Sequence, residues 1–334
     1  MIGIRNLIYC IHKNKANNFI RCITTASEEK IRQSELFGLE KKRQREAVGR
    51  IEKIEVQYEG VPENATLIMN KNLSTPYDCA KHINEMIMNR SVVALLNNDT
   101  VWHMHKPIPD SCKLELLHFK VAQPNMVNKA FWRTCSFLLG ALASESFKDN
   151  VNVQLHSFPS PVIKSGSFVY DIQLSLDNWV PTVAELKVLS IEMVKFCQKH
   201  HKIECLDVSI DFAQEMFKYN PHKTKQIPDI AANNSDKVTL FKVGKHVDIS
   251  KGPMISNTSQ VGRFTLANVI KLDTDIPGDP IYRFQGVALP NSLILNHFAY
   301  GLLEERARKL NSARIPCKQG FSNEDHSFAA QIAV

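Results

Sequence analysis

The sequence has no apolar run that approaches the roughly 18 to 20 residues of a membrane-spanning helix, so we expect no membrane span. It has neither a P-loop nor a glycine-rich dinucleotide fingerprint, which removes the usual nucleotide motifs, and we expect no cofactor. None of the eight cysteines belongs to a Cys-x-x-Cys pair, and several lie in apolar runs, as reduced buried thiols do. These absences argue against a disulfide framework and indicate a reducing compartment.

Composition and charge are those of an ordinary globular protein that is long enough for two domains. The 334 residues are 44% hydrophobic and 22% charged, which allows cores of normal size. The net charge is +7, but the first 27 residues hold four basic side chains and no acidic one, which leaves 37 basic and 34 acidic groups elsewhere. Net charge therefore neither requires nor excludes a nucleic-acid partner, and the position of basic clusters matters more.

The N-terminal residues 1–26 have the composition of a mitochondrial transit peptide. They mix basic and apolar residues with Asn and Thr, and they contain no Asp or Glu. A secretory signal fits less well because basic residues interrupt the apolar stretch, and a disordered basic tail is the remaining alternative. We therefore expect removal of this segment near residues 21–25 and a location in the mitochondrial matrix.

Residues 27–60 predict a charged helical arm. From residue 28 onward the segment holds eight acidic and eight basic side chains, and Leu36, Phe37 and Leu39 give it only a narrow apolar face. We expect such a helix not to pack on a large core. Two interpretations remain open: an arm that lies along RNA phosphates, and a solvated helix stabilised by ion pairs four residues apart.

Residues 61–122 predict a small mixed α/β domain. A helix starts at Pro76 and runs to about Asn89. Alternating patterns predict strands over 65–70, 91–97, 100–106 and 113–119. His103 and His105 share one face of the third strand, which suggests a metal site, but the sequence nearby offers no further ligand. We therefore expect them to be ordinary surface histidines.

Residues 126–295 predict a larger α+β domain, and 296–334 a C-terminal helix and tail. Apolar residues at helical spacing predict long helices over 131–147 and 182–201. Strands are expected over 152–158, 167–175, 238–243, 247–249, 265–271 and 281–289.

A cluster at the end of the second of these helices has metal-ligating side chains: Cys197, His200, His201 and Cys205. A protonated histidine is common at a helix end because it complements the helix dipole. Cys205 lies beyond the expected helix end, and a closed four-ligand site would need an unusual turn. We therefore expect no zinc site here.

Two segments of the larger domain keep the spacing of two known sequence motifs but not the metal-ligand residues of those motifs. Residues 131–140 read Phe-Trp-Arg-Thr-Cys-Ser-Phe-Leu-Leu-Gly, and residues 248–254 read Asp-Ile-Ser-Lys-Gly-Pro-Met. The first resembles a helix with His-x-x-x-His before Leu-Leu-Gly, and the second resembles Asp-Leu-Cys-x-Gly-Pro-His, both from the N-terminal half of threonyl-tRNA synthetase. The residues at the positions of the four candidate ligands are Arg133, Phe137, Ser250 and Met254.

The resemblance covers roughly residues 62–312 as a series of landmarks in the family's order. A segment around 65–120 is similar to the TGS domain. Further matches to Gly-Phe-Tyr-Tyr-Asp, to Ala-x-x-x-Phe followed by Asn-Pro-Tyr-Lys, and to Arg-Ile-x-Gly-x-x-Phe-Pro lie at 166–171, 213–223 and 283–290. This resemblance implies an α+β protein with a helical N-terminal arm, a small TGS-like β-grasp domain and a domain like the editing domain of threonyl- and alanyl-tRNA synthetases.

The four replacements imply that editing chemistry is lost. The guanidinium of Arg133 stays protonated and can neither bind a metal nor act as a base, and Phe137 has no lone pair. Ser250 is a poor zinc ligand, and Met254 is a soft ligand that zinc rarely uses. We expect no catalytic residue, no bound metal and no small-molecule substrate, and hence a protein that is not an enzyme.

The length of the chain points the same way, because 334 residues leave no room for a class II catalytic core and an anticodon-binding domain. The chain resembles a synthetase-derived component of the mitochondrial large ribosomal subunit. This resemblance implies a structural role in mitochondrial translation, with the large-subunit ribosomal RNA and other proteins of that subunit as partners. The basic residues expected to contact RNA backbone are Lys41, Lys42, Arg43, Arg45, Arg50, Lys53, Arg306, Arg308 and Lys309.

Two other functions remain open at this point. The first is a stand-alone protein that binds tRNA or a synthetase in trans, and co-migration with tRNA would identify it. The second is an editing hydrolase with a rearranged site, which would depend on Ser250 or Cys135.

Overall fold

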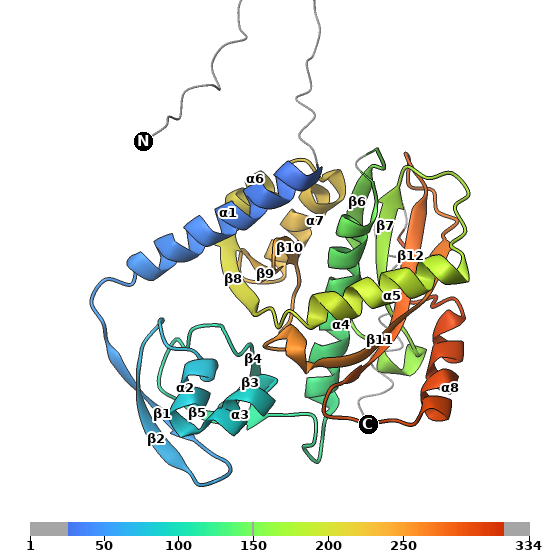
Figure 1. Ribbon diagram of the computed structural model, residues 1–334. Helices are drawn as coiled ribbons and strands as arrows, with labels where there is room; N and C mark the ends of the chain where they lie inside the picture. Colours follow the sequence, from blue (N-terminus) through green and yellow to red (C-terminus); the bar gives the residue numbers. More distant parts are fainter. Residues whose placement is uncertain (1–25, 149, 317–334) are drawn as a thin grey trace, which may run out of the picture.

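The computed structural model of the protein describes residues 26–148 and 150–316. The predictions for residues 1–25 and 317–334, which include the transit peptide and most of the tail, lie outside this part. Within it, three sheets and their helices form a small and a larger domain (Figure 1), which confirms the expected α+β class. None of the helices in residues 26–148 and 150–316 has the length and apolarity to cross a bilayer.

The small domain is a five-stranded mixed sheet with two helices packed against it. The strand order is β2-β1-β5-β3-β4, in which β1 runs parallel to β5 and the other neighbours are antiparallel. Its core forms around Ile87, which is almost fully buried. The elements are β1 Lys53–Tyr58, β2 Ala65–Asn70, α2 Pro76–Ile83, α3 Glu85–Arg90, β3 Val93–Leu96, β4 Thr100–Trp102 and β5 Cys112–Leu117.

Two boundaries in this region differ from the sequence prediction. The expected arm contains helix α1 (Ala26–Glu46) but also strand β1, because alternate residues of β1 are buried in the core of the small domain. The helix expected to run to Asn89 is interrupted at Asn84, whose backbone is extended. Its side chain accepts a hydrogen bond from the N–H of Ile87 at 2.7 Å and so caps a new helix, α3.

The larger domain contains two antiparallel sheets, of order β11-β12-β7-β6 and β10-β9-β8. Its strands are β6 Val153–Ser157, β7 Phe168–Leu174, β8 Ile203–Ser209, β9 Lys237–Val243, β10 His246–Ile249, β11 Val261–Lys271 and β12 Ile281–Pro290. Its helices are α4 Asn125–Ser146, η1 Ile163–Ser165, α5 Val183–Cys197, α6 Ile210–Met216, α7 Pro221–Ala232, η2 Thr258–Gln260 and α8 His297–Arg308.

Helix α4 approaches the four-stranded sheet closely at Gly140. A Cβ at this position would lie 2.7 Å from Cε2 of Tyr170 in β7. Only glycine leaves room for the tyrosine ring there, so the position of the helix on the sheet depends on this residue.

The central strand β12 carries a buried ion pair. Arg283 donates from Nε and Nη2 to the two carboxylate oxygens of Asp171 in β7, both at 2.7 Å, and both side chains are almost fully buried. Burial raises the pKa of Asp171, while the guanidinium opposes this shift. Arg283 also donates from Nη1 to the carbonyl oxygens of Asn311 and Ala313, so the pair holds the segment that follows α8.

Helix α1 packs on the three-stranded sheet, so the expectation that it would not pack on a large core is wrong. Its Phe37 is fully buried among apolar residues of β8, β9, β10, α6 and α7. Arg32 donates to the carbonyl oxygen of Met216 at 2.7 Å, and Gln44 donates to that of Asp207 at 2.8 Å. In Figure 1 the helix crosses the larger domain beside α6 and α7, as a docked element.

We expect Phe37→Ala to lower the free energy of unfolding by about 3 to 5 kcal/mol, because it leaves a cavity in a closed core. Leu39→Ala on the same helix is the matched control. Leu39 is 65% exposed, and its loss is expected to change stability by no more than about 0.5 kcal/mol. Urea unfolding of both variants measures the difference, and equal small effects would contradict the docking of α1.

Candidate functional site

Arg133, Phe137, Ser250 and Met254, which we call the four altered positions, lie where α4 passes the end of β10. They occupy two environments. Arg133 and Ser250 line a cavity. Phe137 and Met254 are fully buried in the main core, where the Phe137 ring packs on that of His246 with centroids 4.9 Å apart. Two of the four positions have thus become part of the core.

The cavity has a volume of about 400 Å³ and lies among the segment after β6, helix α7 and the residues that follow β10. Its lining combines basic side chains with serine hydroxyls and one carboxylate, that of Asp229. The basic groups at this wall are Arg133, Lys223, Lys251 and Arg314.

Arg133 holds the segment that follows β10. Its Nη1 donates to the carbonyl oxygen of Pro253 at 3.2 Å. A Cβ at Gly252 would lie 2.5 Å from the same nitrogen, so glycine at this position leaves space for the guanidinium. Burial lowers the pKa of Arg133, yet a guanidinium remains protonated in proteins and has no lone pair for a metal. The side chain therefore acts as a hydrogen-bonding brace.

Lys223 at the cavity wall belongs to a buried group of three polar side chains, which we call the buried triad. Its Nζ lies 2.6 Å from Oδ1 of Asp248 in β10, and the hydroxyl of Tyr170 donates to Oδ2 of Asp248 at 2.5 Å. Lys223 also donates to the Tyr170 hydroxyl at 3.0 Å. Burial and the charge of Asp248 raise the pKa of Tyr170 well above its ordinary value, so the phenol stays protonated.

The buried triad is not predicted by any local pattern in the sequence. Each member lies in a segment that carries the synthetase resemblance: Tyr170 in 166–171, Lys223 in 213–223 and Asp248 in 248–254. The available signal was that each of the three matching segments contains chargeable or phenolic side chains, without indicating which of them pair. Their pairing joins β7, α7 and β10, which no local pattern predicts.

The residues that a rearranged hydrolase would need lack activation. Cys135 is fully buried, and burial raises the pKa of its thiol well above the ordinary range, so the nucleophilic thiolate does not form at neutral pH. Within the described residues, no hydrogen bond joins the Ser250 hydroxyl to a histidine or a carboxylate. Among the described residues, the Ser250 hydroxyl is therefore not hydrogen-bonded to a general base.

The cysteine and histidine cluster after α5 does not assemble. Burial raises the pKa of Cys197 and of Cys205 to about 12. His200 occupies the turn between them with a φ of 53°, and the ring of His201 packs on Phe196 at 4.8 Å. Across residues 26–148 and 150–316, no three His, Cys, Asp or Glu side chains gather as a metal site would require.

The expectation of surface histidines at positions 103 and 105 is wrong. His103 is 2% exposed and packs on the ring of Phe241 at 5.4 Å. His105 is 9% exposed, and its Nε2 lies 3.0 Å from the carbonyl oxygen of Ser256. Both residues follow β4 and are covered by the larger domain, a long-range contact that the local sequence does not reveal. Burial lowers their pKa to about 3 and about 2 respectively.

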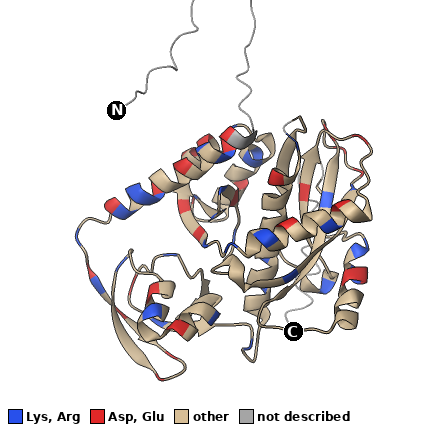
Figure 2. Cartoon of the chain, in the orientation of Figure 1, with Lys and Arg blue, Asp and Glu red and all other residues tan. Residues whose placement is uncertain are grey.

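The nine basic residues expected to contact RNA do not form one patch. Six lie on α1, in the segment that follows it and at the first residue of β1, and three lie at the end of α8 on the other side of the molecule (Figure 1). Figure 2 shows acidic and basic side chains interleaved along α1.

Several of these nine cations are held by the protein's own oxygen atoms. Lys41 pairs with Glu204, Arg43 with Glu40 at 2.7 Å, Lys42 with Glu46 at 3.8 Å, Lys53 bonds Asn70 and Arg306 bonds the carbonyl of Lys164. The remaining four form no ion pair with a described carboxylate: Arg45, Arg50, Arg308 and Lys309.

Removing one charge of the buried triad should lower the free energy of unfolding more than removing both charges. We expect Lys223→Met to lower the free energy of unfolding by about 3 to 5 kcal/mol, because it leaves the Asp248 carboxylate buried without a cation. The double variant Lys223→Met with Asp248→Asn removes both charges, and it should recover part of that loss. Denaturant unfolding of both variants tests this, and a double variant that is less stable than the single one would contradict it.

Four buried histidines should make the fold sensitive to mild acid. Burial lowers the pKa of His103, His105, His156 and His246 to about 3, about 2, about 3 and about 4. As the pH falls through about 6.5, the ordinary pKa of histidine, these side chains become protonated in the unfolded chain but stay neutral in the folded chain. The free energy of unfolding should therefore fall by about 1 kcal/mol per histidine between pH 7 and pH 5.5.

Urea unfolding at the two pH values measures this loss. His246→Phe should reduce the pH-dependent difference by about a quarter, whereas His82→Gln, at an exposed position, should leave it unchanged. Equal stability of the unmodified chain at pH 7 and pH 5.5 would show that these rings are not buried in neutral form.

The chain was compared with proteins of known identity. No model of a known protein family matches it. It is 48% identical over 305 residues to the large ribosomal subunit protein mL39 of Drosophila melanogaster, which covers 91% of this chain and 90% of that protein. It is 25% identical over 250 residues to the probable cytoplasmic threonine–tRNA ligase 1 of Dictyostelium discoideum, and 28% identical over 197 residues to the threonine–tRNA ligase of Thermotoga maritima.

The extent of these matches separates the two kinds of relative. The ligase matches cover 74% and 58% of this chain but only 33% and 28% of the ligases, so the chain spans about a third of their length. The match to the ribosomal protein runs along nearly all of both chains. On this identity and coverage, the chain belongs to the mL39 family of large ribosomal subunit proteins.

Proposed function

We propose that this chain is a non-catalytic structural component of the mitochondrial large ribosomal subunit, which supports translation in the mitochondrial matrix. The observation that carries the proposal is the 48% identity to a large ribosomal subunit protein along nearly the whole of both chains. The altered site agrees with it. Arg133 braces a loop, Phe137 and Met254 fill the core, and the Ser250 hydroxyl has no hydrogen bond to a histidine or carboxylate among the described residues.

The fold is proposed to be a TGS-like β-grasp domain followed by a degenerate editing-like domain. A five-stranded mixed sheet with α2 and α3 packed on it supports the first assignment. The match of 250 residues to a threonine–tRNA ligase supports the second. The boundaries proposed are an arm from residue 27, the TGS-like domain to residue 122, the editing-like domain over 126–295 and a C-terminal helix and tail over 296–334.

Ribosomal RNA is the first proposed partner. The nine basic residues named above are proposed contacts, and within them the four cations without a described carboxylate partner are the ones whose full charge can neutralise phosphate. Lys41 and Arg43 form ion pairs with Glu204 and Glu40, so they contribute less to phosphate binding. Phosphate contacts of this kind position a protein on RNA without reading sequence.

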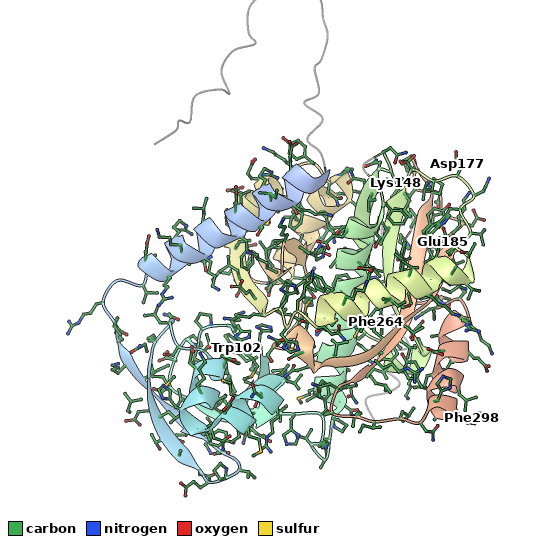
Figure 3. All side chains as sticks on the ribbon, viewed as in Figure 1. Trp102, Lys148, Asp177, Glu185, Phe264 and Phe298 are labelled. Carbon is green, nitrogen blue, oxygen red and sulfur yellow. The ribbon has the colours of Figure 1, made fainter. Side chains whose placement is uncertain are left out.

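Neighbouring ribosomal proteins are the second proposed partner. Exposed apolar side chains gather on the outer side of α5, where Val183, Val188 and Ile191 are all more than half exposed. Ile294 is 97% exposed and Phe298 78% exposed at the start of α8, and Figure 3 shows Phe298 at the edge of the molecule. Apolar side chains that remain exposed in a folded chain commonly mark protein contacts.

We expect the protein to sediment with the large subunit when purified mitochondria are fractionated on a sucrose gradient and followed by immunoblot. The association should persist at high salt, because a component built into the particle is held by protein contacts as well as by salt-sensitive phosphate contacts. Its presence only at the top of the gradient would contradict the proposal. Co-migration with tRNA there would favour a protein that binds tRNA in trans.

A further inference from the structure

A second cavity, of about 500 Å³, lies between the two domains and is separate from the altered site. The small domain contributes the end of α3 and the turn after β5. The larger domain contributes η2 and the turn after β12. Its volume is within the range of about 300 to 1,000 Å³ that small-molecule sites usually occupy.

All the charged side chains that line this cavity are basic. Arg90 and Lys120 are both at the wall, and the lining includes no Asp or Glu. Within residues 26–148 and 150–316, neither cation forms an ion pair. The cavity therefore differs from helix α1, where cations alternate with carboxylates, and its positive charge is available to an anion.

His118 adds a hydrogen-bond donor to the same wall. Burial lowers its pKa, and the nearby charges of Arg90 and Lys120 lower it further, so the ring stays neutral at pH 7. Its Nδ1 accepts a hydrogen bond from the backbone N–H of Lys120 at 3.1 Å. The proton of the neutral ring is therefore on Nε2, which can donate to a ligand.

Gln260 supplies a buried acceptor that nothing in the described protein uses. Its side chain is 4% exposed, and Nε2 donates to the carbonyl oxygen of Ser91 at 2.7 Å, which fixes the orientation of the amide. Oε1 has no hydrogen-bond partner among the described residues. Because a buried polar atom without a partner is unfavourable, a hydroxyl or amine that reached this oxygen from the cavity would be a favourable partner.

We propose that this cavity binds one nucleotide of an RNA strand. A phosphate would lie between Arg90 and Lys120, and a ribose hydroxyl or a base amine would donate to Oε1 of Gln260. Two cations without carboxylates suit a phosphate, and an unused acceptor suits the 2′-hydroxyl that distinguishes RNA from DNA. The inference rests on the proposed function, since the ribosomal role is what brings RNA to the protein.

The test is a fluorescence-anisotropy titration of the full chain with a labelled 12-nucleotide oligouridylate RNA. Arg90→Gln and Lys120→Gln should each weaken binding about 3- to 10-fold and reduce the slope of log affinity against log salt by about 0.7. The matched control is Lys187→Gln, an exposed cation on α5 outside the cavity, which should change neither quantity. Thermal melting of each variant confirms that it is folded.

Gln260→Met tests the acceptor separately, by the ratio of affinities for the RNA and for a DNA of matching length. The ratio should fall towards one, because the variant loses the acceptor but keeps both cations. Loss of the bond to Ser91 could unfold this variant, and the two cation variants then carry the test.

Four outcomes decide between the cavity proposal and the proposed function. Cation variants that behave like Lys187→Gln would overturn the proposal, and so would displacement of the RNA by free uridine monophosphate at equal concentration, since the site would then take a mononucleotide. If the cation variants bind RNA normally and the unmodified chain sediments with the large subunit, only the proposal for this cavity is wrong. If the unmodified chain is absent from the large subunit, the proposed function is wrong.

Discussion

The ion pair between Lys223 and Asp248, completed by the hydroxyl of Tyr170, is the interaction on which the larger domain depends. It joins α7, β10 and β7, so it links two separate sheets, and its three side chains are almost inaccessible to water. Charges buried this deeply are tolerated only when each satisfies the other. Because α4 packs through Gly140 on the ring of the same Tyr170, one buried group positions the altered helix and both sheets.

The altered site follows from that arrangement. With α4 and β10 fixed, the side chains at three of the four altered positions either fill the space between them or brace it, and Ser250 lines the cavity. Phe137 and Met254 fill the core, and Arg133 reaches across to Pro253 in the space that Gly252 leaves open. None of these contacts needs a reactive group, so the region can support the fold without one. In an mL39-family protein, this is consistent with a scaffold that serves an assembly.

Local signals in the sequence predicted much of the fold because capping and periodicity act over a few residues. Helix α2 begins at Pro76 as expected, and a long helix follows Thr182, which forms a capping box with Glu185. The sequence could not predict that Phe37 docks on a sheet or that His103 and His105 are covered, because those partners lie far along the chain. The replacement of metal ligands at the four positions is an expectation that rests on the resemblance alone, and no local pattern predicts how the residues of the buried triad pair.

The central claim is that this protein acts through its surfaces and its fold, without a reactive group at the altered site. The most direct measurement is the rate of mitochondrial protein synthesis in cells whose only copy carries Cys135→Ala together with Ser250→Ala, the thiol and hydroxyl that a hydrolase there would need. The account predicts unchanged synthesis and a normal amount of large subunit. Impaired synthesis with large subunits assembled in normal amount would contradict it.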